Sequence, residues 1–171
     1  MAQRRSEYAR MPADDYATPA WVTDALLKVE HFDDPIWECA PGEGYMVRAL
    51  KENGHEVLTT PGNFLEYHVA PTATIITNPP YKLATLFCVW ATMLVEQKRG
   101  KVAMLLPMDF DAAKGRAGLF RSFRAFKAKY TLLKRIRWAN LEQKAAGPSM
   151  NHAWFVWDWQ WNGPPQLGWI P

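Results

Sequence analysis

The hydrophobic and polar positions of this chain follow two different periods. Short runs of apolar and β-branched residues are typical of buried strands, whereas apolar residues three or four positions apart are typical of helices. The first pattern predicts strands at residues 35–40, 55–59, 72–77, 102–106, 130–138 and 153–159. The second pattern predicts helices at residues 18–28, 45–52, 83–97 and 112–129. Helices and strands therefore alternate along most of the chain.

This alternation predicts the fold class. Strands that alternate with helices form a mostly parallel sheet with helices on both faces. No helical pattern lies between the last two predicted strands, so we expect them to pair antiparallel. The chain is therefore predicted to be an α/β protein with a Rossmann-like sheet that carries an antiparallel edge strand. Ligands of such sheets bind beyond the carboxyl ends of the strands.

The beginning of the chain carries signals of its own. Residues 1–15 are polar, and we expect them to form a mobile arm. Thr18 and Pro19 suit the N-cap and the first position of the first helix. No repeat or long linker divides the sequence, so residues 1–171 are expected to form one domain.

Composition excludes several classes of protein. With 49% hydrophobic and 13% aromatic residues, the chain can bury a core. Cys39 and Cys88 form no CxxC pair, and the four histidines show no ligand spacing, so neither a disulfide framework nor a metal site is expected. No apolar run reaches the ~18 residues of a membrane helix. The start of the chain lacks the apolar core of a signal peptide, and we expect a soluble, cytoplasmic protein with no membrane partner.

The charge is distributed unevenly. Residues 114–144 hold ten basic residues and one acid, although the net charge of the whole chain is only +3. Such a stretch favours binding to a polyanion over a solvated helix face. The residues expected to bind nucleic acid are Lys114, Arg116, Arg121, Arg124, Lys127 and Lys144.

The segment Asn78-Pro79-Pro80-Tyr81 directly follows a predicted buried strand. An exocyclic amine of a nucleobase is a poor nucleophile, because its lone pair is delocalised into the ring. The side-chain carbonyl of Asn78 and the backbone carbonyl of Pro79 could accept its two hydrogens, and the prolines would hold these acceptors in place. Tyr81 offers a ring face to a base taken out of its helix.

A glycine turn, residues 41–44, follows the first predicted strand. Gly42 and Gly44 allow the backbone to approach a ligand closely where a helix begins. A single GxG occurs in many tight turns, so the turn gains meaning from its position upstream of residues 78–81.

Together these features resemble the amino-methyltransferases that act on DNA, in particular the short adenine-specific enzymes of phages and prophages. The resemblance extends from about Asp15 to the last predicted strand, and residues 78–81 match the catalytic motif in full. It implies S-adenosylmethionine as the cofactor and adenine N6 in DNA as the methyl acceptor. It also implies catalytic roles for Asn78, Pro79, Pro80 and Tyr81.

The same resemblance implies a set of cofactor contacts. Residues 16–19 resemble the segment that closes over the methionine end of the cofactor, and residues 38–44 resemble the cofactor loop. Cys39 stands where the family often has proline, and Asn63-Phe64 resembles an Asp-Phe pair that contacts the adenine of the cofactor. The implied cofactor-binding residues are Tyr16, Thr18, Pro19, Glu38, Ala40, Gly42, Gly44, Thr60, Asn63 and Phe64.

Two features depart from the family pattern. The second predicted strand ends in Thr59-Thr60, where the family has an acid that accepts the ribose hydroxyls. Losing such a contact typically costs ~1.5–3 kcal/mol, so either Glu43 or Glu66 substitutes or the cofactor binds weakly. The sequence also shows no separate target-recognition domain. Specificity is therefore expected to be low, or to come from a partner protein or a homodimer.

Two further features have mainly structural interpretations. An aromatic stripe near the end of the chain is expected to face the core; its members are Phe155, Trp157, Trp159 and Trp161, with Trp154 on the opposite face. Asp109 is expected to cap the helix that begins near Ala112.

Other functions remain open at this point. Methylation of cytosine N4, of adenine in RNA or of a protein glutamine would use the same motif, although the basic stretch favours a nucleic acid. The chain could instead be a non-catalytic nucleic-acid-binding module on a decayed methyltransferase fold. The missing ribose acid favours this second class, and the intact motif at residues 78–81 disfavours it.

Overall fold

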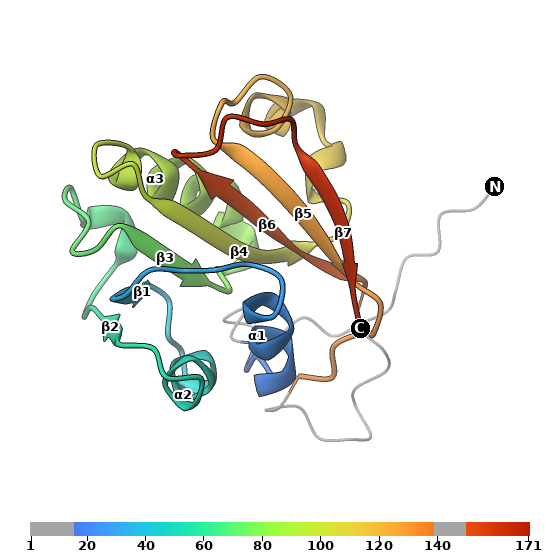
Figure 1. Ribbon diagram of the computed structural model, residues 1–171. Helices are drawn as coiled ribbons and strands as arrows, with labels where there is room; N and C mark the ends of the chain where they lie inside the picture. Colours follow the sequence, from blue (N-terminus) through green and yellow to red (C-terminus); the bar gives the residue numbers. More distant parts are fainter. Residues whose placement is uncertain (1–15, 139–149) are drawn as a thin grey trace.

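The computed structural model describes residues 16–138 and 150–171, so the predicted arm at residues 1–15 lies outside the described residues. Within the described residues, one sheet of seven strands has the order β2-β1-β3-β4-β6-β5-β7 (Figure 1). The strands are β1 (Ile36–Glu38), β2 (Val57–Thr59), β3 (Thr74–Thr77), β4 (Lys101–Pro107), β5 (Phe126–Leu132), β6 (His152–Asp158) and β7 (Gln166–Ile170).

The direction of the strands confirms the predicted fold class. Strands β2, β1, β3 and β4 run parallel to one another. Strand β6 is antiparallel to both of its neighbours, β4 and β5, which confirms the antiparallel pairing of the last two predicted strands. A further strand that we did not predict, β7, pairs in parallel with β5 and forms the edge of the sheet beyond it.

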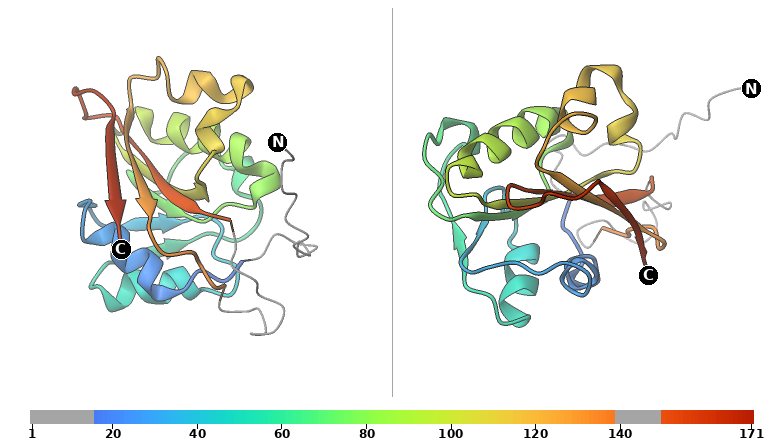
Figure 2. Two further views of the ribbon diagram at one scale, coloured as in Figure 1. Left: turned by 90° about the vertical axis from the view of Figure 1, so that its right-hand side faces the viewer. Right: turned by 45° about the horizontal axis from the view of Figure 1, so that its top comes forward.

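Helices cover both faces of this sheet (Figure 2). Helices α1 (Ala20–Leu27) and α2 (Tyr45–Glu52) pack on one face, and α3 (Ala84–Glu96) packs on the other. Alternate residues of β3 are buried under different helices, because successive side chains of a strand point to opposite faces: Ile76 belongs to the core with α1 and α2, and Ile75 to the core with α3. No helix among the described residues is long and apolar enough to cross a membrane.

The aromatic residues of β6 show the same alternation. Phe155 and Trp157 pack in the core under α3, whereas Trp154 packs in the core under α1, so the expected core face is confirmed for these three residues. Trp159 is half-buried against the core that holds Phe155, and Trp161 belongs to neither core. Each buried indole also satisfies its polar group. Trp154 donates to the carbonyl of Val22 at 3.0 Å, and Trp157 donates to the carbonyl of Leu119 at 3.0 Å.

The predicted helix at residues 112–129 is wrong. This part of the chain contains two short 3₁₀ helices, η3 (Phe110–Ala112) and η4 (Lys114–Leu119), followed by β5. Gly115 and Gly118 weaken a helix here. Residues 126–132 instead gain a place beside the buried strand β6, where Phe126, Ala128 and Leu132 join the core. Asp109 lies at the N-cap of η3, but its side chain makes no capping hydrogen bond.

The first helix also begins differently from our prediction. Pro19 occupies the N-cap of α1 rather than its first helical position, and its carbonyl accepts from the amide of Val22 at 3.0 Å. Thr18 therefore does not cap the helix. Its hydroxyl contacts Asn78 instead, which brings the start of the chain to the carboxyl end of β3.

Candidate functional site

A pocket of about 400 Å³ lies at the carboxyl ends of β1 and β3. This volume lies within the range of small-molecule sites, and ligands of doubly wound sheets bind at this edge. Seven of the implied cofactor-binding residues line the pocket, namely Tyr16, Thr18, Glu38, Ala40, Gly42, Asn63 and Phe64. Asn78 and Pro80 of the predicted catalytic motif line it as well. Segments far apart in the sequence therefore meet in one cavity.

Three of the implied cofactor-binding residues lie outside the wall of this pocket. Pro19 caps α1, and Gly44 is the N-cap of α2. Thr60 instead accepts a hydrogen bond from the indole of Trp37, with 3.0 Å between Trp37 Nε1 and Thr60 Oγ1. The Thr60 hydroxyl thus stabilises a core tryptophan.

The glycine turn between β1 and α2 requires its glycines. Gly42 has a φ of 47° and Gly44 a φ of 76°, a left-handed conformation that other residues adopt only with strain. The turn places Pro41, Gly42 and Glu43 in the pocket wall. The backbone can therefore approach a ligand closely at this point.

The amide of Asn78 is held in one orientation. Its Nδ2 donates to the carbonyl of Tyr16 at 3.2 Å and to the hydroxyl of Thr18 at 3.1 Å. Because a backbone carbonyl can only accept, the NH₂ group must face Tyr16 and the Oδ1 atom must face away from it. Asn78 Oδ1 is buried, and no described residue donates a hydrogen bond to it. A buried acceptor left unpaired typically costs about 1–3 kcal/mol, which suits an atom that is reserved for a ligand.

Tyr81 belongs to an aromatic cluster beside this amide. Its ring stacks on Tyr16 with 5.7 Å between ring centroids, and it lies 5.7 Å from the ring of His152. Trp138 completes the cluster, 5.0 Å from Tyr16 and 5.2 Å from His152. Burial lowers the pKa of His152 to about 4, so its ring is neutral at pH 7. Of the predicted catalytic residues, Pro79 and Tyr81 are not part of the pocket wall.

Glu38 is the buried charge of the pocket. Its Oε1 atom accepts from the amide of Ala40 at 2.9 Å and from the hydroxyl of Thr77 at 2.6 Å. Burial raises the pKa of its carboxyl to about 7, although both hydrogen bonds act in the opposite direction. The effect of desolvation on the pKa therefore outweighs that of the two hydrogen bonds. A positively charged ligand would stabilise the ionised carboxylate of Glu38 in this pocket.

The remaining charge in the pocket has the same sign. Glu43 lines the cavity at the tip of the glycine turn, and none of the described lining residues is basic. Glu66, the other acid considered for the ribose, lies outside the wall and accepts from the side chain of Asn63 at 3.3 Å. The described part of the wall thus offers two carboxylates, Glu38 and Glu43, and no cation.

Sequence reasoning missed several apolar lining residues. Met46 lies in the first turn of α2, and Leu83 and Phe87 lie around the start of α3. Phe87 packs on Phe64 with 4.7 Å between ring centroids. Met46 and Leu83 each follow a recognised motif by two residues, and Phe87 follows Tyr81 by six. Their position after residues 41–44 and 78–81 was therefore the signal that could have found them. Among the described residues, no three His, Cys, Asp or Glu side chains come together as metal ligands.

The residues predicted to bind nucleic acid do not share one helix face. Lys114, Arg121 and Arg124 are exposed, whereas Arg116 lies over the ring of Phe110 at 4.0 Å. Lys127 is bonded to Glu30 at 2.7 Å. Lys144 lies outside the described residues. Binding of nucleic acid by these residues stays a prediction.

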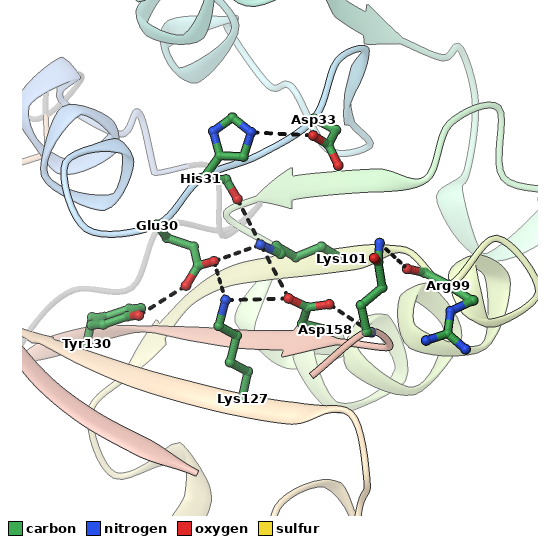
Figure 3. Close-up of polar contacts among 9 residues, drawn as sticks. Glu30, His31, Asp33, Arg99, Lys101, Lys127, Tyr130 and Asp158 are labelled. Atoms are coloured by element: carbon green, nitrogen blue, oxygen red, sulfur yellow. Dashed lines mark hydrogen bonds and ion pairs between the residues drawn. The ribbon is translucent and has the colours of Figure 1, made fainter. Parts of the chain in front are cut away.

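Lys127 belongs to a polar cluster at the end of the strands opposite to the pocket (Figure 3). Glu30 Oε1 accepts from Lys101 and Lys127, each at 2.7 Å, and Glu30 Oε2 accepts from Tyr130 at 3.0 Å. Asp158 adds a second carboxylate, 3.3 Å from Lys101 and 3.4 Å from Lys127. Burial lowers the pKa of Lys101, but the two acids outweigh it and the pKa is raised. Two lysines and two acids thus balance, which indicates a structural role.

Comparisons with known proteins place the fold. The chain is similar to a Listeria monocytogenes protein assigned as a class I S-adenosylmethionine-dependent methyltransferase, with 9% identity over 93% of this chain and a TM-score of 0.60. It is also similar to the type I restriction-modification methyltransferase subunit of Streptococcus thermophilus, with 12% identity over 84% of this chain and a TM-score of 0.55. A protein of Vibrio vulnificus YJ016 assigned as the modification subunit of a type I restriction enzyme shows 13% identity over 90% of this chain and a TM-score of 0.59.

At these identities the likeness shows the fold alone, which is that of S-adenosylmethionine-dependent methyltransferases. The chain spans 66% of the Listeria protein and 45% and 46% of the other two. No family model and no curated protein matches the sequence.

Proposed function

We propose that this chain is an S-adenosylmethionine-dependent methyltransferase that modifies the N6 amino group of adenine in DNA. The observation that carries the proposal is the Asn78 amide, whose orientation is fixed by Tyr16 and Thr18 and whose Oδ1 is buried without a partner among the described residues. Two of the structural neighbours are assigned to restriction-modification systems, and this supports DNA as the substrate.

The pocket fits the cofactor in size and charge. S-adenosylmethionine carries a sulfonium and an ammonium group, and the described wall offers Glu38 and Glu43 with no opposing cation. We assign Asn63 and Phe64 to its adenine and Glu43 to its ribose, since Glu43 lines the pocket whereas Thr60 and Glu66 do not. When bound, the cofactor supplies an electrophilic methyl group.

The protein's own contribution is to prepare the target amine. Asn78 Oδ1 accepts one hydrogen of the amine, and the backbone carbonyl of Pro79 accepts the other, which favours a tetrahedral nitrogen with its lone pair available. Because Tyr16 and Thr18 already hold the Asn78 amide, no reorganisation is needed when the base arrives. Proline at the next two positions limits movement of the loop.

The target sequence requires a source of specificity. The neighbours from restriction-modification systems are subunits of larger assemblies, as their assignments state. We propose that this chain likewise obtains sequence specificity from a partner protein or from a second copy of itself.

The experiment that tests the function measures methyl transfer and cofactor binding separately. Tritiated methyl transfer is measured to DNA with adenine, to DNA without adenine, to RNA and to protein, with the natural protein, Asn78→Ala and Asn162→Ala as a matched surface control. Removing one preorganised group at a reacting centre typically costs about 10²–10³ in rate. We expect Asn78→Ala to lose at least ~100-fold in rate while calorimetry still detects cofactor binding, and Asn162→Ala to keep full activity.

Other outcomes would overturn parts of this proposal. Equal rates for natural protein and Asn78→Ala would remove the amide from the mechanism. Transfer to DNA without adenine, or to RNA or protein alone, would replace the proposed acceptor. Absence of cofactor binding by the natural protein would favour a non-catalytic module.

A further inference from the structure

The segment that follows β5 has an alternating pattern of burial. Ile136 and Trp138 are buried, at 1% and 4% exposure, whereas Lys134, Arg135 and Arg137 are exposed. Buried anchors on either side of Arg137 hold this part of the chain against the core, in contact with α1 (Figure 1). The two arginines are therefore presented to solvent from a fixed backbone.

This segment lies next to the proposed catalytic amide. The Trp138 ring packs on Tyr16, 5.0 Å between centroids, and the carbonyl of Tyr16 holds the Asn78 amide at 3.2 Å. The Trp138 ring also packs on His152, which in turn contacts the ring of Tyr81. Arg137 thus directly precedes Trp138, which reaches Asn78 through a single intervening residue, Tyr16.

No carboxylate of the described residues compensates the charge of Arg135 or Arg137. Arg135 donates from Nε to the neutral side chain of Asn151 at 2.9 Å, and the nearby Lys134 lies 5.0 Å from the ring of Trp21. Within residues 16–138 and 150–171, neither Arg135 nor Arg137 forms an ion pair with a carboxylate. The lysines inside β5 differ, since Lys127 pairs with Glu30 and Lys129 pairs with Asp111 at 2.8 Å.

The other exposed arginine pair lies elsewhere. Arg124 donates to Asn162 at 3.3 Å, just beyond the end of β6. Because β6 is antiparallel to β4, its end at Asp158 pairs with the start of β4, whereas its beginning at His152 pairs with Pro107. Asn78 follows β3, which is parallel to β4, so Asn78 lies at the same end of the strands as His152. Arg124 lies at the opposite end of the strands.

We propose that Arg135 and Arg137 bind the phosphodiester backbone of the DNA strand that carries the target base. This proposal rests on the proposed methyltransferase function and assigns its DNA contact. The planar guanidinium group matches the geometry of a phosphate and can donate two hydrogen bonds to it. Contacts of this kind set the position of the strand and carry no sequence information, which places the base over the Asn78 site whatever its neighbours are.

The test compares two matched pairs of arginines. Arg135→Gln/Arg137→Gln and Arg121→Gln/Arg124→Gln each remove two exposed charges, and in each pair one arginine is bonded to an asparagine. Fluorescence anisotropy measures the affinity of each protein for a DNA duplex between 50 and 200 mM salt, values that span roughly the usual working range. Calorimetry with S-adenosylmethionine confirms that each variant keeps a folded pocket.

The magnitude follows from counterion release. The loss of two phosphate contacts makes the negative slope of log K, the logarithm of the association constant, against log salt shallower by about 1.8 on duplex DNA. This change corresponds to roughly 60-fold weaker binding at 0.1 M salt. We expect this loss in Arg135→Gln/Arg137→Gln and less than about a twofold loss in Arg121→Gln/Arg124→Gln. The proposal therefore leaves Arg121 and Arg124 out of the nucleic-acid surface that the charge pattern predicted, because they lie at the opposite end of the strands. Arg135→Lys/Arg137→Lys keeps both charges and should keep the slope.

The possible results separate this proposal from the proposed function. An unchanged slope in Arg135→Gln/Arg137→Gln, or an equal loss in the Arg121 and Arg124 pair, would overturn the assignment of the DNA contact. Cofactor binding and methyl transfer by the natural protein would be unaffected by that result. If the natural protein binds DNA but neither binds the cofactor nor transfers methyl, the proposed function fails while the arginine comparison still gives its answer.

Discussion

The buried carboxyl of Glu38 makes the stability of the protein depend on pH. Its side chain lies at the end of β1, and its Oε1 atom accepts from Ala40 and Thr77. The substitution Glu38→Gln keeps an acceptor for these two donors but removes the ionisable group. Comparison of the natural protein with this variant therefore isolates the energy of ionisation at one position.

The size and sign of this energy follow from the pKa. Burial raises the pKa of Glu38 from 4.5 to about 7, and one pKa unit corresponds to about 1.4 kcal/mol. A raised carboxyl pKa means that the folded state binds the proton more tightly than the unfolded state. The contribution to stability is fully present below pH 4.5 and is lost as the pH rises through about 7. The natural protein should thus lose about 3 kcal/mol relative to Glu38→Gln over this window.

Urea unfolding at several pH values between 4.5 and 8 measures this difference. The difference between the two free energies of unfolding should fall with rising pH and become constant above about pH 8. Groups elsewhere titrate in both proteins and cancel in the difference. A difference that does not change with pH would show that Glu38 titrates near its ordinary pKa, and the argument that desolvation dominates this pocket would be refuted.

Two further predictions concern buried polar groups outside the pocket wall. Burial lowers the pKa of His152 from 6.5 to about 4, so relative to His152→Gln the natural protein should lose about 3 kcal/mol as the pH falls from 6.5 to 4. Urea unfolding over that range checks this, and an unchanged difference would mean that the ring is not desolvated. The substitution Glu30→Ala leaves Asp158 as the one carboxylate beside Lys101 and Lys127 among the described residues, so we expect a loss of about 3–5 kcal/mol in the free energy of unfolding at pH 7. A loss below about 1 kcal/mol would show that water solvates the two lysines instead.

The parts of the fold that could be predicted are those with a short-range signal. The helix at residues 45–52 has the predicted bounds, because its apolar spacing and its Asn53-Gly54 end agree. The buried strands β3 and β4 are rich in apolar residues and end at proline-containing segments. The motifs at residues 41–44 and 78–81 are each one continuous stretch of sequence that directly follows a predicted strand. Their place at the carboxyl ends of β1 and β3 therefore followed from the order of the elements.

The edge of the sheet was harder to predict, because its strands have little local signal. In β7 only Ile170 is buried, and Leu167 and Trp169 are exposed, so no regular core pattern marks the strand. Gly168 lies so close to Tyr130 that a Cβ atom at this position would be 2.6 Å from its ring. The glycine thus marks a close approach of two strands, although a glycine in sequence alone suggests a turn.

The basic stretch shows how a charge count can mislead. The ten basic residues at 114–144 favoured a polyanion-binding surface, yet two of them, Lys127 and Lys129, lie in β5 and pair with acids from other elements. Those acids, Glu30 and Asp111, are far away in sequence, so only the fold reveals which cations are compensated. Arg135 and Arg137, which form no ion pair with a described carboxylate, follow β5 and lie at the same end of the strands as Asn78.

The orientation of Asn78 depends on contacts of this long-range kind. Its partners, Tyr16 and Thr18, are 62 and 60 residues away in sequence. From the sequence alone, a threonine before a proline such as Thr18 suits a helix N-cap as well as it suits a contact with Asn78. The structure uses Thr18 for the amide because Pro19 takes the N-cap position of α1. The motif at residues 78–81 supplies the acceptor, but the start of the chain determines which way that acceptor points. A substitution at Thr18 should therefore affect the proposed methyl transfer through Asn78 rather than through the stability of α1.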